Sequence, residues 1–168
     1  DKWHETISTK EFESVLFFKN HGPMSGGSIR HPHSQIIGLR TYDYHEDITV
    51  ENMNGWLLHE DQDIRITLSK HPIIGFFEYN LRYKPDAPVR SIAMRLQQTI
   101  RYVLDSLAKF SQSYNYFFYQ LEDGYEYIKV IPRYITTPLY VGYKIPQTCN
   151  DERAAKILQN ITPYFELK

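Results

Sequence analysis

Two histidines in the run His31-Pro32-His33-Ser34-Gln35 are the side chains of this sequence best suited to chemistry. In an extended segment alternate side chains point the same way, so His31, His33 and Gln35 are expected on one side. A neutral imidazole can act as a nucleophile or as a metal ligand. An isolated pair of histidines is more often buried and satisfied at a strand end, so the residues upstream decide between these interpretations.

The segment before the histidines has the composition of an anion-binding loop. Asn20 supplies an amide side chain and Ser28 supplies a hydroxyl group. Gly26 and Gly27 lack a side chain, which allows backbone N–H groups to approach a phosphate closely. The combined pattern therefore favours an anion cradle next to a histidine nucleophile.

Together these residues form the pattern Phe-x-Asn-x-Gly-x-x-x-Gly-x-Ser, two residues, then His-Pro-His-x-Gln. This pattern resembles the active-site signature of the galactose-1-phosphate uridylyltransferase family, a branch of the histidine-triad superfamily. The resemblance implies that His33 attacks the α-phosphorus of a nucleotide and becomes nucleotidylated, while Asn20, Ser28 and Gln35 donate hydrogen bonds to phosphate oxygens. Gln35 stands where the hydrolytic branch has a third histidine. An amide cannot donate a proton to a leaving group as an imidazolium can, so the resemblance implies transfer rather than hydrolysis.

The same resemblance implies a structural zinc site. His31 matches a zinc ligand found in many members of the family, and His4 resembles a further ligand. A closed zinc shell needs four ligands. The family's Cys-x-x-Cys pair would lie ahead of residue 1, so the expected site is incomplete in this chain. His4 could also be a surface histidine. The His-x-His of a second, iron-type site is replaced by Tyr127-Ile128-Lys129, so that site is not expected.

A second segment, Tyr140-Val141-Gly142-Tyr143-Lys144, resembles the family's substrate-facing segment. Tyr143 and Lys144 are therefore further candidates for substrate binding. In the family an acidic residue that binds sugar hydroxyls usually occupies the position of Lys144, and a lysine cannot accept hydrogen bonds. The resemblance therefore leaves galactose 1-phosphate doubtful as a substrate.

The periodicity of apolar residues predicts mostly strands and one long helix. Apolar residues spaced at about 3.6 positions predict the helix over residues 89–110, and a shorter helix should begin at Asp151. Ser8 and Glu11 form a capping box, which predicts another helix starting there. Strand-like segments cover residues 14–19, 34–39, 56–69, 73–83, 114–121, 125–133 and 140–145, with turns at 61–63 and 70–72.

These elements predict an α+β fold in which an antiparallel sheet carries a long helix across it. The resemblance implies a HIT-like (histidine-triad-like) fold built from two degenerate halves, the first of them truncated. Residues 1–50 would be the C-terminal part of the first half and carry the His-Pro-His-x-Gln site. Residues 51–168 would form the second half.

Composition excludes several classes of partner. The 168 residues carry a net charge of −1 without a polybasic stripe, so no nucleic-acid partner is expected. No apolar run is long enough to span a bilayer, so no membrane partner is expected either. A single cysteine, Cys149, excludes an internal disulfide and favours a cytoplasmic location.

The sequence thus predicts a nucleotidyltransferase that works through a nucleotidyl-histidine intermediate. Its substrate would be a nucleotide sugar, of UDP-hexose or ADP-sugar type, or a dinucleotide, and a homodimer is possible. Two alternatives stay open. One is a nucleotide phosphorylase with the same mechanism, and the other is a non-catalytic nucleotide-binding module.

Overall fold

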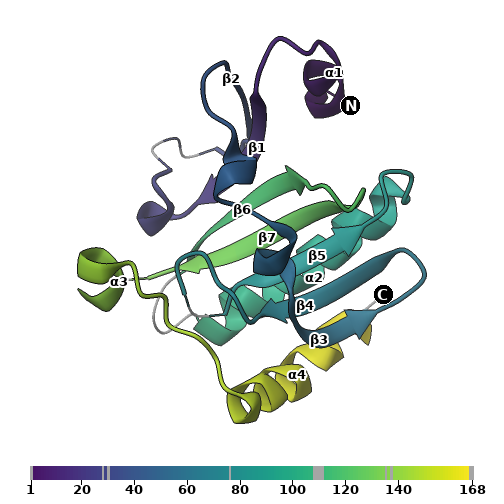
Figure 1. The fold of residues 1–168 in the computed structure, drawn as a ribbon. Coiled ribbons are helices and arrows are strands. Elements are labelled where there is room, and N and C mark those ends of the chain that lie inside the picture. The colour runs from purple at the N-terminus through teal and green to yellow at the C-terminus, as the bar shows by residue number, and fades with distance from the viewer. Residues whose placement is uncertain are drawn as a thin grey trace.

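A computed structural model describes residues 2–27, 29, 31–75, 77–107, 112–134, 136 and 138–166 of the chain. These residues form one seven-stranded antiparallel sheet, four α-helices and three 3-10 helices, labelled η (Figure 1). In chain order the elements are α1 (Lys2–Ser8), β1 (Ser14–His21), η1 (Pro23–Ser25), β2 (Gln35–Leu39), η2 (Tyr44–Glu46), η3 (Val50–Met53), β3 (Gly55–Glu60), β4 (Ile64–Ser69), β5 (Tyr79–Tyr83), α2 (Val89–Leu107), β6 (Ser113–Gln120), β7 (Glu126–Arg133), α3 (Pro138–Tyr143) and α4 (Asp151–Glu166).

The strand order in the sheet is β2-β1-β6-β7-β5-β4-β3. Strands β3, β4 and β5 form an antiparallel meander, while β6 and β7 form a hairpin. Strand β1 pairs with β2 on one side and with β6 on the other. One continuous sheet therefore contains strands from both sides of residue 50, and the expected division of the chain there stays a prediction.

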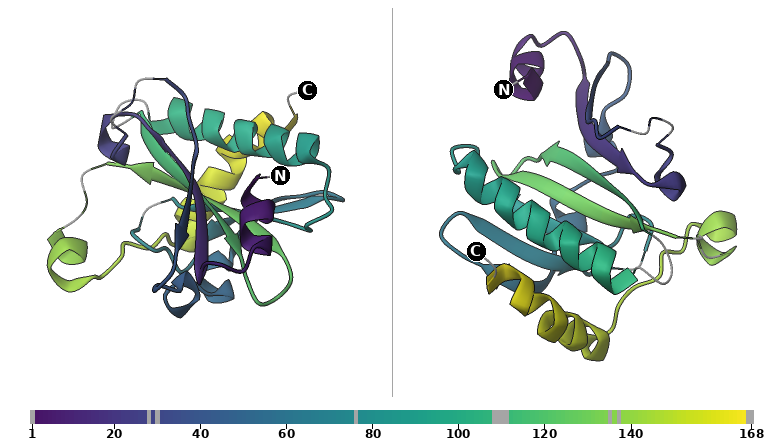
Figure 2. Two further views of the ribbon diagram at one scale, coloured as in Figure 1. Left: turned by 90° about the horizontal axis from the view of Figure 1, so that it is seen from above. Right: turned by 180° about the vertical axis from the view of Figure 1, so that it is seen from behind.

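One face of the sheet carries most of the apolar core. Along β4, Ile64, Ile66 and Leu68 are buried in a cluster with residues of α2 and α4, whereas Arg65 and Thr67 lie on the other face. Helices α2 and α4 lie side by side across the first face (Figure 2). The expected long helix and its apolar stripe are confirmed, because Ile92, Leu96, Ile100 and Val103 all pack against this core. Among the residues that the structure describes, no helix combines the length and apolar character needed to cross a bilayer.

The opposite face is covered over part of its area by the segment that contains η2 and η3. Tyr44 and Met53 from this segment are buried with Tyr119 and Tyr127 of the sheet. The rings of Tyr44 and Tyr119 meet edge to face, with centroids 5.6 Å apart. The Tyr44 hydroxyl donates to the carbonyl of Gln120 and accepts its N–H, both at 3.1 Å. This segment therefore fastens the connection from β2 to β3 onto the sheet.

The helix predicted after Ser8 is wrong, because α1 ends at that residue. The Ser8 hydroxyl donates backwards to the His4 carbonyl at 2.7 Å, and Lys10 has a positive φ of 56°, which turns the chain out of the helix. Buried Trp3 anchors α1, since its indole N–H donates to the Val15 carbonyl at 2.9 Å.

The strand predicted over residues 140–145 is also wrong, because Pro138–Tyr143 is a helix. Proline suits the first turn of a helix, where its missing N–H costs no hydrogen bond. Val141 and Tyr143 are 66% and 76% exposed, so the segment is not part of the sheet core that its composition suggested.

Candidate active site

The loop between β1 and β2 turns sharply, and glycine is required at its start. Gly22 has a φ of 79°, and a Cβ atom there would lie 2.4 Å from the Ser113 hydroxyl and 2.9 Å from the Gln112 carbonyl. Gly26 has a φ of 82°. The hydroxyl of Ser25 donates to the Gly22 carbonyl at 2.7 Å and accepts the N–H of Gly27. These contacts fold the glycine-rich segment back over the end of β1.

Asn20 is held in one orientation by a chain of hydrogen bonds across the sheet. Arg133 donates to the Asn115 Oδ1 atom at 2.8 Å. The Asn115 Nδ2 atom in turn donates to Asn20 Oδ1 at 2.6 Å and to the Ser25 carbonyl at 3.0 Å. Because these hydrogen bonds occupy the side-chain oxygen of Asn20, the side-chain nitrogen of Asn20 is the group that is left to donate to a ligand.

His33 has its two ring nitrogens in different surroundings. Nδ1 lies 3.0 Å from the backbone carbonyl of His31. A carbonyl only accepts hydrogen bonds, so Nδ1 carries the proton and the neutral ring keeps a lone pair on Nε2. The carbonyl of His33 accepts a hydrogen bond from the Lys19 ammonium at 3.3 Å. The His31 and His33 rings are 5.6 Å apart, and His31 is exposed.

Gln35 begins β2 and lies opposite Phe18 in the strand pairing. Alternate residues of a strand share a face, so Gln35 lies on the face that also carries Asn20. The Ser34 hydroxyl lies 3.3 Å from the hydroxyl of Tyr116, which belongs to the face covered by the helices. His33 and Gln35 therefore flank a residue that points the other way.

A cavity of about 380 Å³ opens beside this loop. Of the predicted site residues, Asn20, Gly27 and His31 line it, together with Lys19. His33, Gln35 and Gly26 do not line it, and Ser28 lies outside the described residues. The structure thus places Asn20, Gly27 and His31 at one cavity, while His33 is joined to them through Lys19 and the His31 carbonyl.

The predicted metal ligands do not form a zinc shell in the described part of the chain. His4 lies in α1, where its Nε2 atom contacts Glu126 Oε1 at 2.5 Å. Glu126 pairs with Gln120 of β6. Gln120 is five residues, or roughly 16 Å along the strand, from Asn115, whose partner Asn20 lines the cavity that also contains His31. The described residues contain no group of three or more histidine, cysteine or acidic side chains placed to hold a metal. The zinc site therefore has no support from this geometry and stays a prediction.

Tyr143 ends α3, and Lys144 follows it with a positive φ of 57°. The Lys144 ammonium lies 5.3 Å from the centre of the Tyr140 ring. Neither Tyr143 nor Lys144 lines the cavity at the β1–β2 loop. Their predicted role in substrate binding stays a prediction.

Sequence reasoning missed two residues that shape this site, Asn115 and Arg133. Both are separated from the loop by about a hundred residues, and only the pairing of β1 with β6 places Asn115 opposite Asn20. No local pattern marks them. Lys19 stood inside the motif, but its contact with the His33 carbonyl depends on the folded loop.

The antiparallel sheet with a helix across it and a glycine-rich loop bearing two histidines defines a mixed α/β protein with a candidate phosphate site. The chain belongs to the family described as "Domain of unknown function (DUF4931)". It matches the N-terminal domain of that family over residues 1–42 and the C-terminal domain over residues 45–165. No curated protein matches the chain.

Two solved structures are similar to this chain. One is a DUF4931 family protein from Bacillus cereus, which is 38% identical with a TM-score of 0.84, and the match covers 99% of this chain and 75% of that one. The other is a uridylyltransferase mutant, which is 16% identical with a TM-score of 0.71, and the match covers 95% of this chain and 67% of that one. At this identity the second likeness is one of fold.

Proposed function

We propose that the protein is a nucleotidyltransferase in which His33 carries the nucleotidyl group. The hydrogen bond from His33 Nδ1 to the His31 carbonyl supports this proposal most directly. It fixes the tautomer whose Nε2 lone pair can attack phosphorus, and the carbonyl also stabilises the positive ring that forms after attack. A fold shared with a uridylyltransferase is consistent with this chemistry. We also propose that the fold of this protein belongs to the HIT-like class.

The reaction proceeds in two displacements. The Nε2 lone pair of His33 forms a bond to the α-phosphorus, and the bond from phosphorus to the leaving phosphate oxygen breaks with its electron pair. An oxygen of the acceptor phosphate then attacks the same phosphorus, and the P–N bond returns its electrons to Nε2. The proton on Nδ1 remains hydrogen-bonded to the His31 carbonyl throughout.

The surrounding residues would stabilise charge on the phosphate oxygens. The proposed donors are the Asn20 amide nitrogen, the backbone N–H group of Gly26, the Ser28 hydroxyl and the Gln35 amide. Because Gln35 cannot act as a general acid, the leaving group must be a good one, such as a sugar phosphate or nucleotide. A nucleotide sugar or a dinucleotide is therefore the proposed donor substrate.

Trapping of the intermediate tests the proposal. Intact-mass spectrometry after incubation with a panel of nucleotide sugars and dinucleotides should show a protein adduct that carries one nucleoside monophosphate. His33→Asn removes the attacking atom and should abolish the adduct. His71→Asn is the matched control, because His71 is exposed and its Nε2 atom lies 3.8 Å from Glu51 in a different part of the chain. An adduct that persists in His33→Asn removes His33 as the nucleophile.

One observation favours a second candidate function, a nucleotide-binding module without turnover. His33 does not line the cavity that Asn20 and Gly27 border. In that case nucleotides should bind tightly to both wild type and His33→Asn, and neither protein should form an adduct. A phosphorylase would form the adduct and release it to inorganic phosphate.

A further inference from the structure

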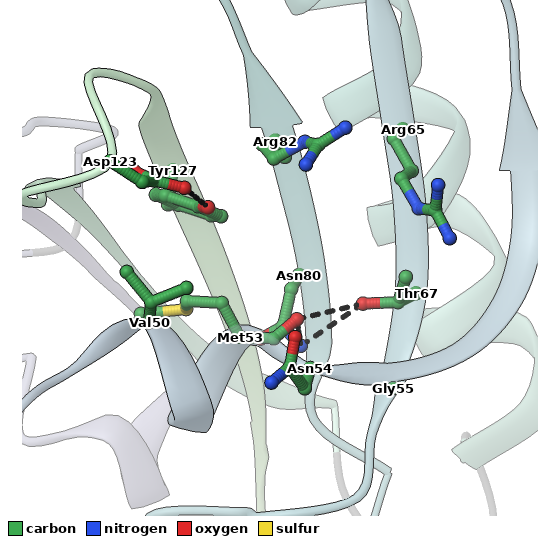
Figure 3. A pocket seen from close by; sticks show the side chains of 10 residues that line it. All are labelled: Val50, Met53, Asn54, Gly55, Arg65, Thr67, Asn80, Arg82, Asp123 and Tyr127. Atoms are coloured by element: carbon green, nitrogen blue, oxygen red, sulfur yellow. Dashed lines mark hydrogen bonds between the residues drawn. The ribbon is translucent and has the colours of Figure 1, made fainter.

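A second cavity, of about 240 Å³, lies on the face of the sheet opposite α2 and α4 (Figure 3). It shares no lining residue with the cavity at the β1–β2 loop. Arg82 in this cavity and Asn20 in the other are three strands and about four strand residues apart, or roughly 20 Å. A small ligand in one cavity therefore cannot reach the other.

Two arginines stand directly opposite each other in this cavity. Arg65 of β4 pairs with Arg82 of β5, and both lie at the end of the cavity away from Asn54 and Gly55 (Figure 3). Like charges directly opposite on neighbouring strands destabilise a sheet. An arrangement of this kind calls for a compensating negative charge.

The described residues compensate these two charges only in part. Arg65 lies 3.2 Å from Glu60, but both side chains are 40–45% exposed, and such pairs contribute little. The Arg82 guanidinium stacks 4.3 Å from the Tyr125 ring centre, and no carboxylate of the described residues lies within 4.0 Å of it. Arg82 is therefore held in place without a counter-charge.

Asp123 is the acidic residue among the residues that line this cavity. Its Oδ2 atom accepts a hydrogen bond from the Tyr127 hydroxyl at 2.5 Å. With two arginines and one aspartate, the lining keeps an excess positive charge. Its electrostatics therefore favour an anion.

The other wall of the cavity is rigid and polar. Asn80 donates to the Met53 carbonyl at 3.1 Å and to the Thr67 hydroxyl at 3.2 Å, and Thr67 donates to the same carbonyl (Figure 3). The side-chain amide of Asn54, also in the lining, has no hydrogen bond to the described residues. Asn54 lies at the far end of the cavity, because its neighbour Gly55 pairs with Ser69, four strand residues or roughly 13 Å from Arg65.

We propose that this cavity binds a small phosphate-bearing anion between Arg65 and Arg82. A guanidinium presents parallel N–H groups that match the oxygens of a phosphate. Pockets for drug-sized ligands span about 300–1,000 Å³, so a cavity of 240 Å³ suits inorganic phosphate or a small phosphomonoester rather than a nucleotide. The inference stands independently of the proposed chemistry at His33.

Titration of the protein with inorganic phosphate, followed by amide NMR signals at constant ionic strength, tests this site. The signals of Gly55 and Thr67, which line the cavity, should shift in a saturable way. Arg82→Gln and Arg65→Gln should each weaken this binding at least about tenfold, because each removes a charged donor. Two variants keep the test informative if one of them folds poorly.

Two controls locate the effect. Arg101→Gln removes the same charge from α2, where Arg101 is 65% exposed, and should leave the phosphate affinity unchanged. His33→Asn should also leave the shifts at Gly55 and Thr67 intact, which separates this cavity from the β1–β2 loop. The proposal fails if phosphate does not shift these two signals, or if the shifts survive in both arginine variants. It fails as a phosphate site if acetate binds equally well.

Discussion

The buried ion pair between Glu78 and Lys129 offers a quantitative test of the fold. Both side chains are fully buried, and Lys129 Nζ lies 3.2 Å from Glu78 Oε2. The Glu78 carboxylate also accepts the N–H groups of Ile73, Ile74 and Gly75 at 2.7–3.1 Å. Burial lowers the pKa of Lys129 from its usual value, and Glu78 opposes that shift. One carboxylate thus compensates a buried cation and organises a loop.

Removal of one partner leaves the other charge buried without compensation. For Glu78→Gln we expect a loss of about 3–5 kcal/mol in the free energy of unfolding. Lys129→Met should cost a similar amount, since its ammonium also donates to the Asn52 carbonyl at 2.8 Å and to Asn80 Oδ1 at 2.7 Å. The double variant removes both charges, and its loss should fall short of the sum by about 2–3 kcal/mol. The free energy of unfolding of a single domain is roughly 5–15 kcal/mol in total, so each single variant is a severe perturbation.

Urea unfolding followed by circular dichroism gives the four free energies of this double-mutant cycle. Glu152→Gln is the control, because it breaks an exposed pair with Lys156 on α4 and should change little. The reasoning is refuted if the free energy of unfolding of Glu78→Gln lies within about 1 kcal/mol of the wild-type value. It is also refuted if the losses of the two single variants simply add in the double variant.

Two further predictions concern hydrogen-bonded side chains. Asn115→Asp keeps acceptor oxygens but removes the hydrogen-bond donor to Asn20. We therefore expect kcat/KM for nucleotidyl transfer to fall about 10–100-fold. A kcat/KM within twofold of wild type would contradict the positioning role of Asn115. Burial alone would raise the pKa of Asp61, but hydrogen bonds from His59, from two backbone N–H groups and from Arg95 lower it to about 2 from its usual 3.8. Stabilisation by Asp61 is therefore present above about pH 4 and lost as the pH falls toward 2. In Asp61→Asn the urea midpoint should change less between pH 4 and pH 2 than in wild type, and an unchanged difference would contradict this assignment.

The local elements of the fold were largely predictable because they follow simple periodicities. The alternation of Ile64, Ile66 and Leu68 with polar residues marks β4, and the 3.6-residue stripe marks α2. The turn at residues 61–63 was also predictable, since Asp61 accepts the N–H groups of Asp63 and Ile64. These features depend on neighbours in the sequence.

Features that depend on distant partners were not predictable. The strand predicted over residues 73–83 begins only at Tyr79, because Ile73, Ile74 and Gly75 donate their N–H groups to the Glu78 carboxylate, whose charge partner Lys129 is on β7. Likewise the motif predicts Asn20 as a phosphate ligand, but the orientation of Asn20 is set by Asn115, whose position follows only from the strand order. The site residues that lie in the motif on one loop could be predicted from the sequence. Asn115 and Arg133, which hold Asn20 in place, could not.

The pairing of β1 with β6 also constrains when the candidate site can form during synthesis. Asn115 follows Asn20 by 95 residues. At synthesis rates of about 5–20 residues per second, the partner of Asn20 is made roughly 5–20 seconds later. Until then β1 can pair with β2 but lacks its second neighbouring strand, and an isolated hairpin is at best marginally stable in water. The histidine-bearing loop is therefore synthesised before the strand that orients Asn20, so this part of the candidate site is completed only after β6 has paired with β1.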